Sequence, residues 1–376
     1  MKKKVIVAGN ICLDITPMFP DRKVEKVTDI MLPGKLIEMG SADIHTGGAV
    51  ANTGLAMKLL GADVSLVAKI GKDSFGYIIS EILKKYNTQE GLIVADGEAT
   101  SYSVVLAMPG IDRIFLHNPG ANHTLRTDDI PEKAFDEASL LHFGYPPVMR
   151  SMYEDDGNEL IKLMKKAKDK GISTSLDLAA VDDNSEAGKA DWKKILTEVI
   201  PYVDFFVPSA EELCYMMDRK RFDSWLERAG ERDITEILDI EKDIKPLADI
   251  CMSCGAKVVL IKCGAKGMYY RTAGRKALQT VGGGIELDPA GWADKEGFEK
   301  SFVPEKILSG TGAGDTSIAA FITAMLEGSA IEECVRLAAA EGASCVTAFD
   351  ALGGIRTLDE LRSKIAAGWK KMLAEE

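Results

Sequence analysis

Short β-branched runs recur along this chain, and each is followed by a segment with the length and apolar pattern of a helix. The runs expected to be strands are 4–8, 64–70, 140–143, 173–178, 205–207 and 258–262. The helical patterns lie near 49–60, 75–86, 153–170, 190–199, 210–217, 234–254, 314–327, 331–349 and 358–373. Alternation of this kind predicts an α/β fold in which helices cover both faces of a mostly parallel central sheet.

Four segments depart from this alternation. Residues 15–45 and 100–118 contain turn residues among alternating side chains, and we expect them to form a small second sheet outside the main one. Residues 218–233 and 282–300 are polar or glycine-rich insertions without an assigned role. A chain of this length can bury one large core, so residues 1–376 are expected to form a single domain with these insertions.

The charge balance and the cysteines narrow the class of protein. Lys and Arg number 46 against 58 Asp and Glu, and the net charge of −12 disfavours nucleic acid as a partner. No stretch approaches the ~18 apolar residues that a membrane-spanning helix needs, so no membrane partner is expected. The seven cysteines are an odd number in apolar or helical contexts, which predicts reduced thiols and a cytoplasmic protein.

The run 310–315 reads Gly-Thr-Gly-Ala-Gly-Asp and leads into an apolar helix. Small residues let the backbone approach a ligand, and the amides at a helix start form a phosphate site together with the helix dipole. The carboxylate of Asp315 would repel that phosphate unless it takes a proton from an attacking hydroxyl, so the pattern points to phosphoryl transfer. The alternative is a carboxylate that only complements the helix dipole.

Two further clusters have the chemistry of a hydroxyl-binding site. Gly47 and Gly48 let backbone amides press against a ligand, and Asn52 can donate to and accept from hydroxyls. Asn10 and Asp14 follow the first strand, where ligands of doubly wound sheets bind, and the carboxylate can accept from two vicinal hydroxyls of a sugar. The alternatives are a plain turn at a helix start and a carboxylate that caps its own turn.

Other cofactor motifs are missing from the sequence. Gly34-Lys35 and Gly71-Lys72 lack the upstream glycine and the following Ser or Thr of a P-loop. The glycines near 312 lack the third glycine and the βαβ position of a dinucleotide fingerprint, which disfavours a dehydrogenase. The four histidines show neither metal-ligand spacing nor pairing with a nucleophilic Ser or Cys, so hydrolase chemistry has no support.

The run that ends at Asp315 resembles the C-terminal signature of the ribokinase-like (PfkB) carbohydrate kinases, Asp-Thr-x-Gly-Ala-Gly-Asp. The resemblance implies that Asp315 is the general base and that the amides of Gly312, Ala313 and Gly314 form the anion hole. Upstream, Ser-Gly replaces the usual Asp-Thr. In some relatives this region helps hold a monovalent cation, so the departure weakens the case for potassium activation.

The glycine pair and Asn52 resemble the family's N-terminal signature, Gly-Gly-x-x-x-Asn. In the family, the aspartate equivalent to Asp14 binds the sugar, with the equivalent of Asn10 close by. Residues 112–115 resemble the family's lid hairpin. Arg113 on that hairpin is expected either to reach an anionic substrate group or a phosphate, or to be a solvated strand residue.

The nucleotide side rests on a second set of matches. Ser209 and Glu212 match the family's Asn-x-x-Glu motif, in which the glutamate organises magnesium through water, with Ser in place of Asn. Ser209 is also a good N-cap for a helix at 210–217, so a capping role stands beside the magnesium role. The strand end at Lys262 either touches a phosphate oxygen or lies at the surface. The resemblance implies a nucleotide-binding surface made of Ser209, Lys262, Gly264, Gly267 and Thr311.

The resemblance covers nearly the whole chain. It implies a ribokinase-like three-layer αβα sandwich with a small β lid formed by about 15–45 and 100–118. It also implies ATP-dependent phosphorylation of a hydroxymethyl group on a small sugar or sugar acid, with Mg²⁺ as cofactor and a homodimer formed through the lid. Two alternatives are a nucleoside kinase of the same fold, which would admit an aromatic base beside the ribose, and a non-catalytic sugar- or nucleotide-binding protein.

Overall fold

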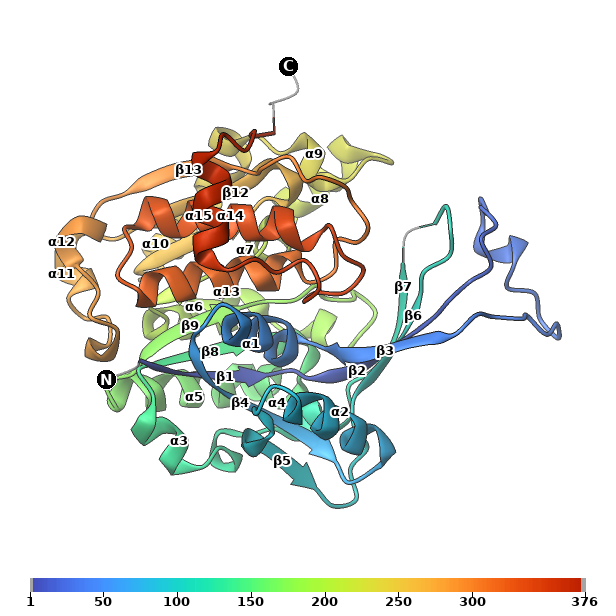
Figure 1. Cartoon of the computed structure of the whole chain (residues 1–376). Helices are drawn as coiled ribbons and strands as arrows, with labels where there is room; N and C mark the ends of the chain where they lie inside the picture. Colours follow the sequence, from blue (N-terminus) through green and yellow to red (C-terminus); the bar gives the residue numbers. More distant parts are fainter. Residues whose placement is uncertain (1–2, 112, 373–376) are drawn as a thin grey trace.

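Two sheets organise the structure, a computed structural model that describes residues 3–111 and 113–372 (Figure 1). The main sheet has nine strands in the order β13-β12-β11-β10-β9-β8-β1-β4-β5. They are β1 (Lys4–Gly9), β4 (Asp63–Gly71), β5 (Leu92–Ala95), β8 (Leu140–Gly144), β9 (Ser173–Asp177), β10 (Phe205–Phe206), β11 (Val258–Lys262), β12 (Gly267–Thr272) and β13 (Glu296–Lys300).

Pairing in the main sheet is parallel from β5 across to β11, and only β12, which pairs antiparallel with β11 and with β13, runs in the opposite direction. On the central strand, Val5 is paired with Val64 on one side and with Leu140 on the other. Parallel neighbours need crossover connections, and helices make most of them. The expected α/β class and the mostly parallel sheet are confirmed.

Helices cover both faces of this sheet. They are α1 (Ala49–Leu59), α2 (Ser74–Lys84), α3 (Glu132–Glu137), α4 (Arg150–Tyr153), α5 (Asn158–Asp169), α6 (Trp192–Val199), α7 (Ala210–Met217), α8 (Arg219–Ala229), α9 (Ile234–Ile237), α10 (Lys245–Ser253), α11 (Arg275–Leu278), α12 (Pro289–Trp292), α13 (Ala313–Leu326), α14 (Ile331–Cys345) and α15 (Leu358–Ala366).

Alternating side chains on the strands create two apolar cores. Val5 and Val7 of β1 belong to one core, together with α1, α13 and α14, whereas Ile6 and Ala8 belong to the other, with α5, α6, α7 and α10. Strands such as β1, β8 and β11 are buried on both faces, which is why their sequences are almost continuous apolar runs. The helix–sheet–helix layering is the expected three-layer sandwich.

Four helical segments differ from their expected bounds. The pattern at 234–254 forms α9, a π-helical turn at Ile240–Ile244, and α10, because Leu238 and Asp239 have extended backbones and the Asp239 side chain caps the second helical stretch. The helix expected from 153 begins at Asn158, after Asp156 and Gly157 adopt left-handed backbone conformations. The helices expected to end at 349 and 373 end at Cys345 and Ala366.

The small sheet has the strand order β3-β2-β6-β7 and stands beside the body of the molecule (Figure 1). Its strands are β2 (Cys12–Pro17), β3 (Ala42–Gly47), β6 (Tyr102–Leu106) and β7 (Ile114–Asn118). The β6–β7 hairpin and the connection from β2 to β3 extend away from the main sheet (Figure 1). The two segments expected to form a second sheet therefore do form one, next to the carboxyl end of β1.

The two segments expected to be insertions have regular structure. Residues 218–233 contain α8, and residues 282–300 contain α12 and the edge strand β13. Among residues 3–111 and 113–372, no helix has the length and apolar character that crossing a membrane requires.

Candidate active site

Asp315 lies in the first turn of α13 and is only 4% exposed. Its Oδ2 accepts a hydrogen bond from Asn52 Nδ2 at 3.0 Å, and its Oδ1 accepts one from Thr53 Oγ1 at 3.2 Å. The Tyr145 hydroxyl lies 2.8 Å from Oδ1 and 2.9 Å from Oδ2. Burial raises the pKa of Asp315, whereas the charge of Lys262 and these three donors oppose the rise.

Three elements bring these donors to Asp315. Asn52 and Thr53 are in the first turns of α1, which packs against α13. Gly54 allows α1 to approach β4, because a Cβ there would lie 2.3 Å from Leu66 Cδ2. Tyr145 follows the carboxyl end of β8 and has a left-handed backbone with φ of 69°. The Asn52 side-chain amide contacts the Asp315 carboxylate, and its expected contact with a substrate hydroxyl stays a prediction.

Lys262 joins Asp315 from the main sheet. Its Nζ lies 2.7 Å from Asp177 Oδ1, and both side chains are mostly buried. A Cβ on Gly314 would lie 3.6 Å from the same Nζ, so the ammonium lies beside the start of α13. Burial alone would lower the pKa of Lys262, but the carboxylates of Asp177, Glu212 and Asp315 raise it above its ordinary value. Lys262 is thus a buried cation next to the expected anion hole, not a surface residue.

The start of α13 has the geometry of an anion site, in which the Ala313 amide makes a long hydrogen bond within the protein. Gly312 precedes the helix with φ of 76°, and a Cβ there would lie 2.2 Å from Ala351 Cβ, so glycine is required. The Ala313 amide donates to the Gly310 carbonyl over a long 3.3 Å. The helix dipole points its positive end at this turn, where the Lys262 ammonium also lies. An anion placed here would meet amides, dipole and ammonium together.

Ser209 and Glu212 form a reciprocal capping box at the start of α7. Ser209 Oγ accepts from the Glu212 amide at 3.3 Å, and Glu212 Oε2 accepts from the Ser209 amide at 2.9 Å. The serine is therefore a helix cap, as the alternative interpretation required. The charges of three carboxylates, Asp177, Glu212 and Asp315, act on Lys262. Among residues 3–111 and 113–372, no group of three or more His, Cys, Asp or Glu side chains is arranged to hold a metal ion, so the magnesium role of Glu212 stays a prediction.

Asn10 and Asp14 lie against the glycine pair at the start of α1. A Cβ on Gly47 would lie 2.0 Å from Asp14 Oδ2, and a Cβ on Gly48 would lie 2.3 Å from Asn10 Oδ1. Both polar side chains are buried, and Asn10 Nδ2 has no hydrogen-bond partner within the described part of the chain. A buried donor without a partner is costly, so this amide is suited to a polar ligand. The four residues therefore come together as the sequence predicted.

The expected hydroxyl-binding residues lie close to the expected base. Gly48 is the N-cap of α1 and its carbonyl accepts from the Asn52 amide at 2.9 Å, while the Asn52 side chain contacts Asp315. Four residues of helix span about 6 Å, so one helical turn separates the two groups. A small ligand held by Asp14 and Asn10 would place a substituent near Asp315.

One face of the small sheet presents a polar row toward this ligand position. Cross-strand pairing aligns Asp14 with His45 and Ser103, and Ser103 with His117. Cys12 Sγ lies 3.2 Å from Asp14 Oδ1, and His117 Nδ1 lies 3.0 Å from Ser103 Oγ. Burial lowers the pKa of His117 despite the charge of Asp14, which favours the neutral imidazole. The row therefore surrounds Asp14 with polar donors and acceptors, and a second carboxylate, Asp43, lies 3.4 Å from His45.

Arg113 connects the small sheet to the loop before α13. Its Nη1 donates to Ser309 Oγ at 3.0 Å, and the same oxygen accepts from the Thr311 amide at 3.1 Å. Arg113 is thus neither a plain solvated strand residue nor distant from the site. Its neighbour at position 112, part of the expected lid hairpin, lies outside the described residues.

Gly264 and Gly267 have packing reasons for being glycine. Both have positive φ, of 57° and 131°. A Cβ on Gly264 would lie 2.7 Å from Thr235 Oγ1, and a Cβ on Gly267 would lie 2.1 Å from the Glu299 carbonyl oxygen. These contacts explain the residue type without a nucleotide, so the nucleotide role of both glycines stays a prediction.

Sequence reasoning missed Tyr145, Thr53 and Asp177. Tyr145 and Asp177 stand at the carboxyl ends of β8 and β9, and the rule that ligands bind at this edge of a parallel sheet could have identified them. Thr53 is adjacent to Asn52 and carries no signal of its own. No short motif contains all three, because each comes from a different crossover unit.

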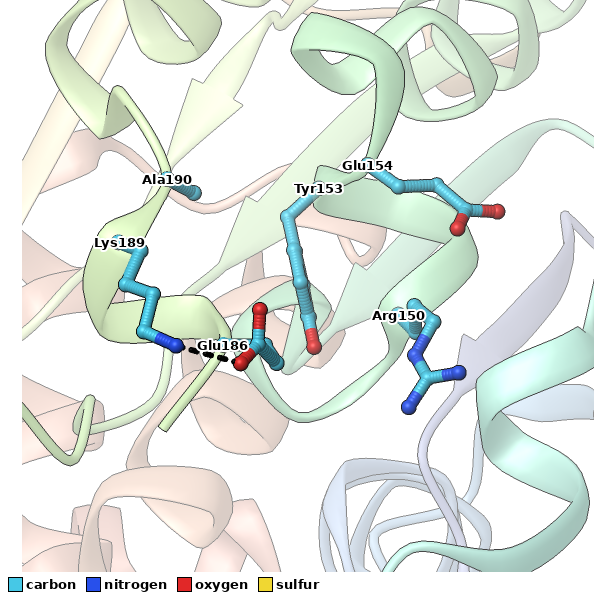
Figure 2. A pocket seen from close by; sticks show the side chains of 6 residues that line it. All are labelled: Arg150, Tyr153, Glu154, Glu186, Lys189 and Ala190. Carbon is cyan, nitrogen blue, oxygen red and sulfur yellow. Dashed lines mark hydrogen bonds and ion pairs between the residues drawn. The ribbon is translucent and has the colours of Figure 1, made fainter. Parts of the chain in front are cut away.

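A surface pocket of about 490 Å³ lies elsewhere, at the end of α4. Figure 2 shows its six lining residues, among which Lys189 and Glu186 form an ion pair of 2.6 Å. The pair is three residues apart and mostly exposed, so it contributes little. None of the residues expected to bind substrate or nucleotide lines this pocket.

Comparisons with known proteins agree with this geometry. The chain matches the model of the pfkB family of carbohydrate kinases over residues 7–357. It is 23% identical over 339 residues to the 2-dehydro-3-deoxygluconokinase of Bacillus subtilis. That alignment covers 89% of this chain and 90% of the relative. It is 26% identical over 340 residues to fructokinase-2 of Solanum lycopersicum, covering 86% of this chain and 87% of the relative.

Solved structures share the fold. Arabidopsis thaliana ribokinase, complexed with ribose and ATP, superposes with a TM-score of 0.69 at 22% identity, covering 96% of this chain and 98% of that one. A protein of Escherichia coli in complex with ATP and Mg²⁺ has a TM-score of 0.68 at 20% identity, covering 97% and 99%. Because the family model matches most of the sequence and the ribokinase fold is reproduced, the chain belongs to the pfkB family of carbohydrate kinases.

Proposed function

We propose that this chain transfers the γ-phosphoryl group of ATP to a hydroxymethyl group of a small sugar or sugar acid, with Asp315 as the general base. One observation carries the proposal: Asp315 is a buried carboxylate in the first turn of α13, between the polar cluster at Asp14 and the cation Lys262. A base beside an anion site has the arrangement that phosphoryl transfer to an alcohol needs.

The residues of the chain supply position and charge. Asp14 and Asn10 bind hydroxyls of the acceptor, and Asp315 takes the proton of the attacking hydroxyl. The amides of the 312–314 turn, the helix dipole and Lys262 stabilise the negative charge that spreads over the transferring oxygens. Magnesium, when bound, neutralises phosphate charge, and Glu212 would hold it through water. Catalysis on this proposal is mostly positioning.

The small sheet is proposed to be a lid made by segments 15–45 and 100–118. Its polar face carries Asp14, and Arg113, the residue before β7, reaches the loop before α13. Closing this sheet over the sugar would exclude water from the transferring phosphoryl group. Its other face pairs Ile15 with Ile44 and with Val104, and Val104 with Leu116.

That second face is apolar and partly exposed, with Ile44 at 46% and Leu116 at 54%. We propose that a second copy of the chain covers it, giving a homodimer through the lid. Light scattering of the wild type is expected to show a dimer. Leu116→Glu is expected to shift the protein to a monomer, because it places a charge in the apolar contact.

A panel of acceptors tests the proposed function. ADP release is measured with fructose, ribose, ketodeoxygluconate and adenosine, for the wild type and for Asp315→Asn. One sugar or sugar acid is expected to support turnover that Asp315→Asn loses. Turnover with adenosine alone would instead identify a nucleoside kinase, and ATP binding without turnover on any acceptor would support a non-catalytic protein.

A further inference from the structure

Three donors of the protein surround the Asp315 carboxylate. Asn52 donates to Oδ2 and Thr53 donates to Oδ1, and the Tyr145 hydroxyl lies against both oxygens at 2.8 and 2.9 Å. An acceptor hydroxyl must also reach this carboxylate, because Asp315 has to receive its proton. The Tyr145 hydroxyl has a single proton to donate. It nevertheless lies where an incoming hydroxyl could contact either oxygen, so it is the donor that an acceptor hydroxyl would displace.

The three donors are anchored unequally. Asn52 and Thr53 are 8% and 0% exposed and belong to α1, whose packing against α13 holds them in place. Tyr145 is half-buried and lies in the connection after β8, with φ of 69° and ψ of 44°. A left-handed conformation is strained for a residue with a bulky side chain. The tyrosine is consequently the donor whose departure breaks the least packing.

We propose that the Tyr145 hydroxyl covers Asp315 until an acceptor hydroxyl replaces it, and that this exchange limits transfer of the phosphoryl group to water. The inference rests on the proposed function and deepens it. Tyr145 is then a positioning residue, which acts through the base. Burial and the charge of Asp315 raise the pKa of the phenol, so it keeps its proton and stays a hydrogen-bond donor to Asp315.

The two competing reactions differ in the attacking oxygen. With the sugar in place, its oxygen forms a bond to the γ-phosphorus, the bond from that phosphorus to the bridging oxygen breaks, and ADP leaves with the electron pair. The proton of the sugar hydroxyl goes to Asp315. With water in place, the same bonds change and the products are ADP and phosphate. A phenol held on the base by two close contacts keeps water from that position.

The test measures a ratio, the rate of ATP hydrolysis without acceptor divided by the rate of sugar phosphorylation. Tyr145→Phe keeps the ring and removes the hydroxyl. The ratio is expected to rise by roughly 10-fold, because loss of a hydrogen bond to a charged group changes an equilibrium by about that factor. Tyr145→Asn serves as a second variant, because asparagine tolerates the left-handed backbone. It is expected to raise the ratio in the same direction.

Tyr77→Phe is the matched control, since it also removes only a phenol hydroxyl, from an exposed tyrosine on α2. The ratio in Tyr77→Phe is expected to stay at the wild-type value. Adding Asp315→Asn to Tyr145→Phe is expected to abolish the extra hydrolysis, which shows that water uses the same base. An unchanged ratio in both Tyr145 variants, or extra hydrolysis that survives without Asp315, overturns the inference.

The wild type separates this failure from that of the proposed function. If the wild type phosphorylates a sugar and the ratio does not move, the role of Tyr145 alone is wrong. If the wild type phosphorylates no acceptor, the proposed function and the inference fall together.

Discussion

Asp315 and Asp14 are both buried carboxylates of the candidate site, and the structure surrounds them differently. Asp315, on the side of the main sheet, accepts from Asn52, Thr53 and Tyr145. Asp14, on the small sheet, accepts from the weak thiol donor Cys12 and rests against a glycine. Asp315, the proposed base, is already oriented by three donors of the protein. Asp14, the proposed sugar ligand, keeps acceptor positions for hydroxyls of a ligand.

Because of this difference, substitutions around Asp315 and substitutions around Asp14 should change different kinetic parameters. Loss of a group that acts on the transferring phosphoryl should lower kcat, because the interaction is made in the transition state. Loss of a group that binds the acceptor in both the ground and the transition state should raise KM. The following substitutions test this division.

The largest effect is expected for Asp315→Asn. Removal of a general base lowers kcat by ~10²–10⁴. ATP binding should stay close to that of the wild type, because the amides and Lys262 remain. Steady-state kinetics and nucleotide titration measure the two quantities. A variant that keeps roughly a third or more of wild-type kcat would contradict the role of Asp315 as base.

Asp14→Ala tests the small-sheet side. It removes an acceptor for two hydroxyls, and charge-assisted hydrogen bonds contribute ~1.5–3 kcal/mol, so the sugar KM should rise by ~10-fold or more. The KM for ATP should barely change. Asp43→Ala is a matched control, since Asp43 is an exposed carboxylate on the neighbouring strand. Equal losses for sugar and ATP would make Asp14 a structural residue.

The two residues of the proposed magnesium motif, Ser209 and Glu212, should respond differently to substitution. Glu212→Gln should raise the magnesium concentration for half-maximal rate by ~10-fold or more, the size of effects on groups that orient metal ligands. Ser209→Ala should instead lower the free energy of unfolding by ~1 kcal/mol, as loss of an N-cap does. Magnesium titrations and thermal unfolding distinguish them. Equal magnesium shifts in both variants would show that the serine acts on the metal as well as on the helix.

The smallest effect is a pH shift in Thr53→Val. Burial raises the pKa of Asp315, and the hydrogen bond from Thr53 lowers it by favouring the ionised form. Its removal should raise the pKa, and because the base must be ionised to accept a proton, the acid limb of kcat/KM should move to higher pH. Asp14→Ala should leave this limb in place. A shift to lower pH in Thr53→Val would contradict the assignment.

Local patterns in the sequence predicted much of the fold. The six expected strands all occur, because strands buried on both faces, such as β1 and β11, are almost continuous apolar runs that can be recognised in the sequence. The helix at 234–254 was wrong as a single element, since the chain becomes extended at Leu238 and Asp239 and restarts at the Asp239 cap, and an apolar periodicity that continues past this point does not reveal the break. Ser209 as an N-cap was correct, because capping depends on residues three apart in the chain.

The sequence by itself determined the layers, the glycine-rich start of α13 and the identity of the proposed base, because each depends on neighbours within a few residues. The tertiary structure alone decided the surroundings of that base. Tyr145 and Asn52 lie 170 and 263 residues from Asp315 along the chain, and the strand order and the packing of α1 on α13 bring them within hydrogen-bond distance. No local pattern encodes such contacts, since they form only when separate crossover units meet at one edge of the sheet.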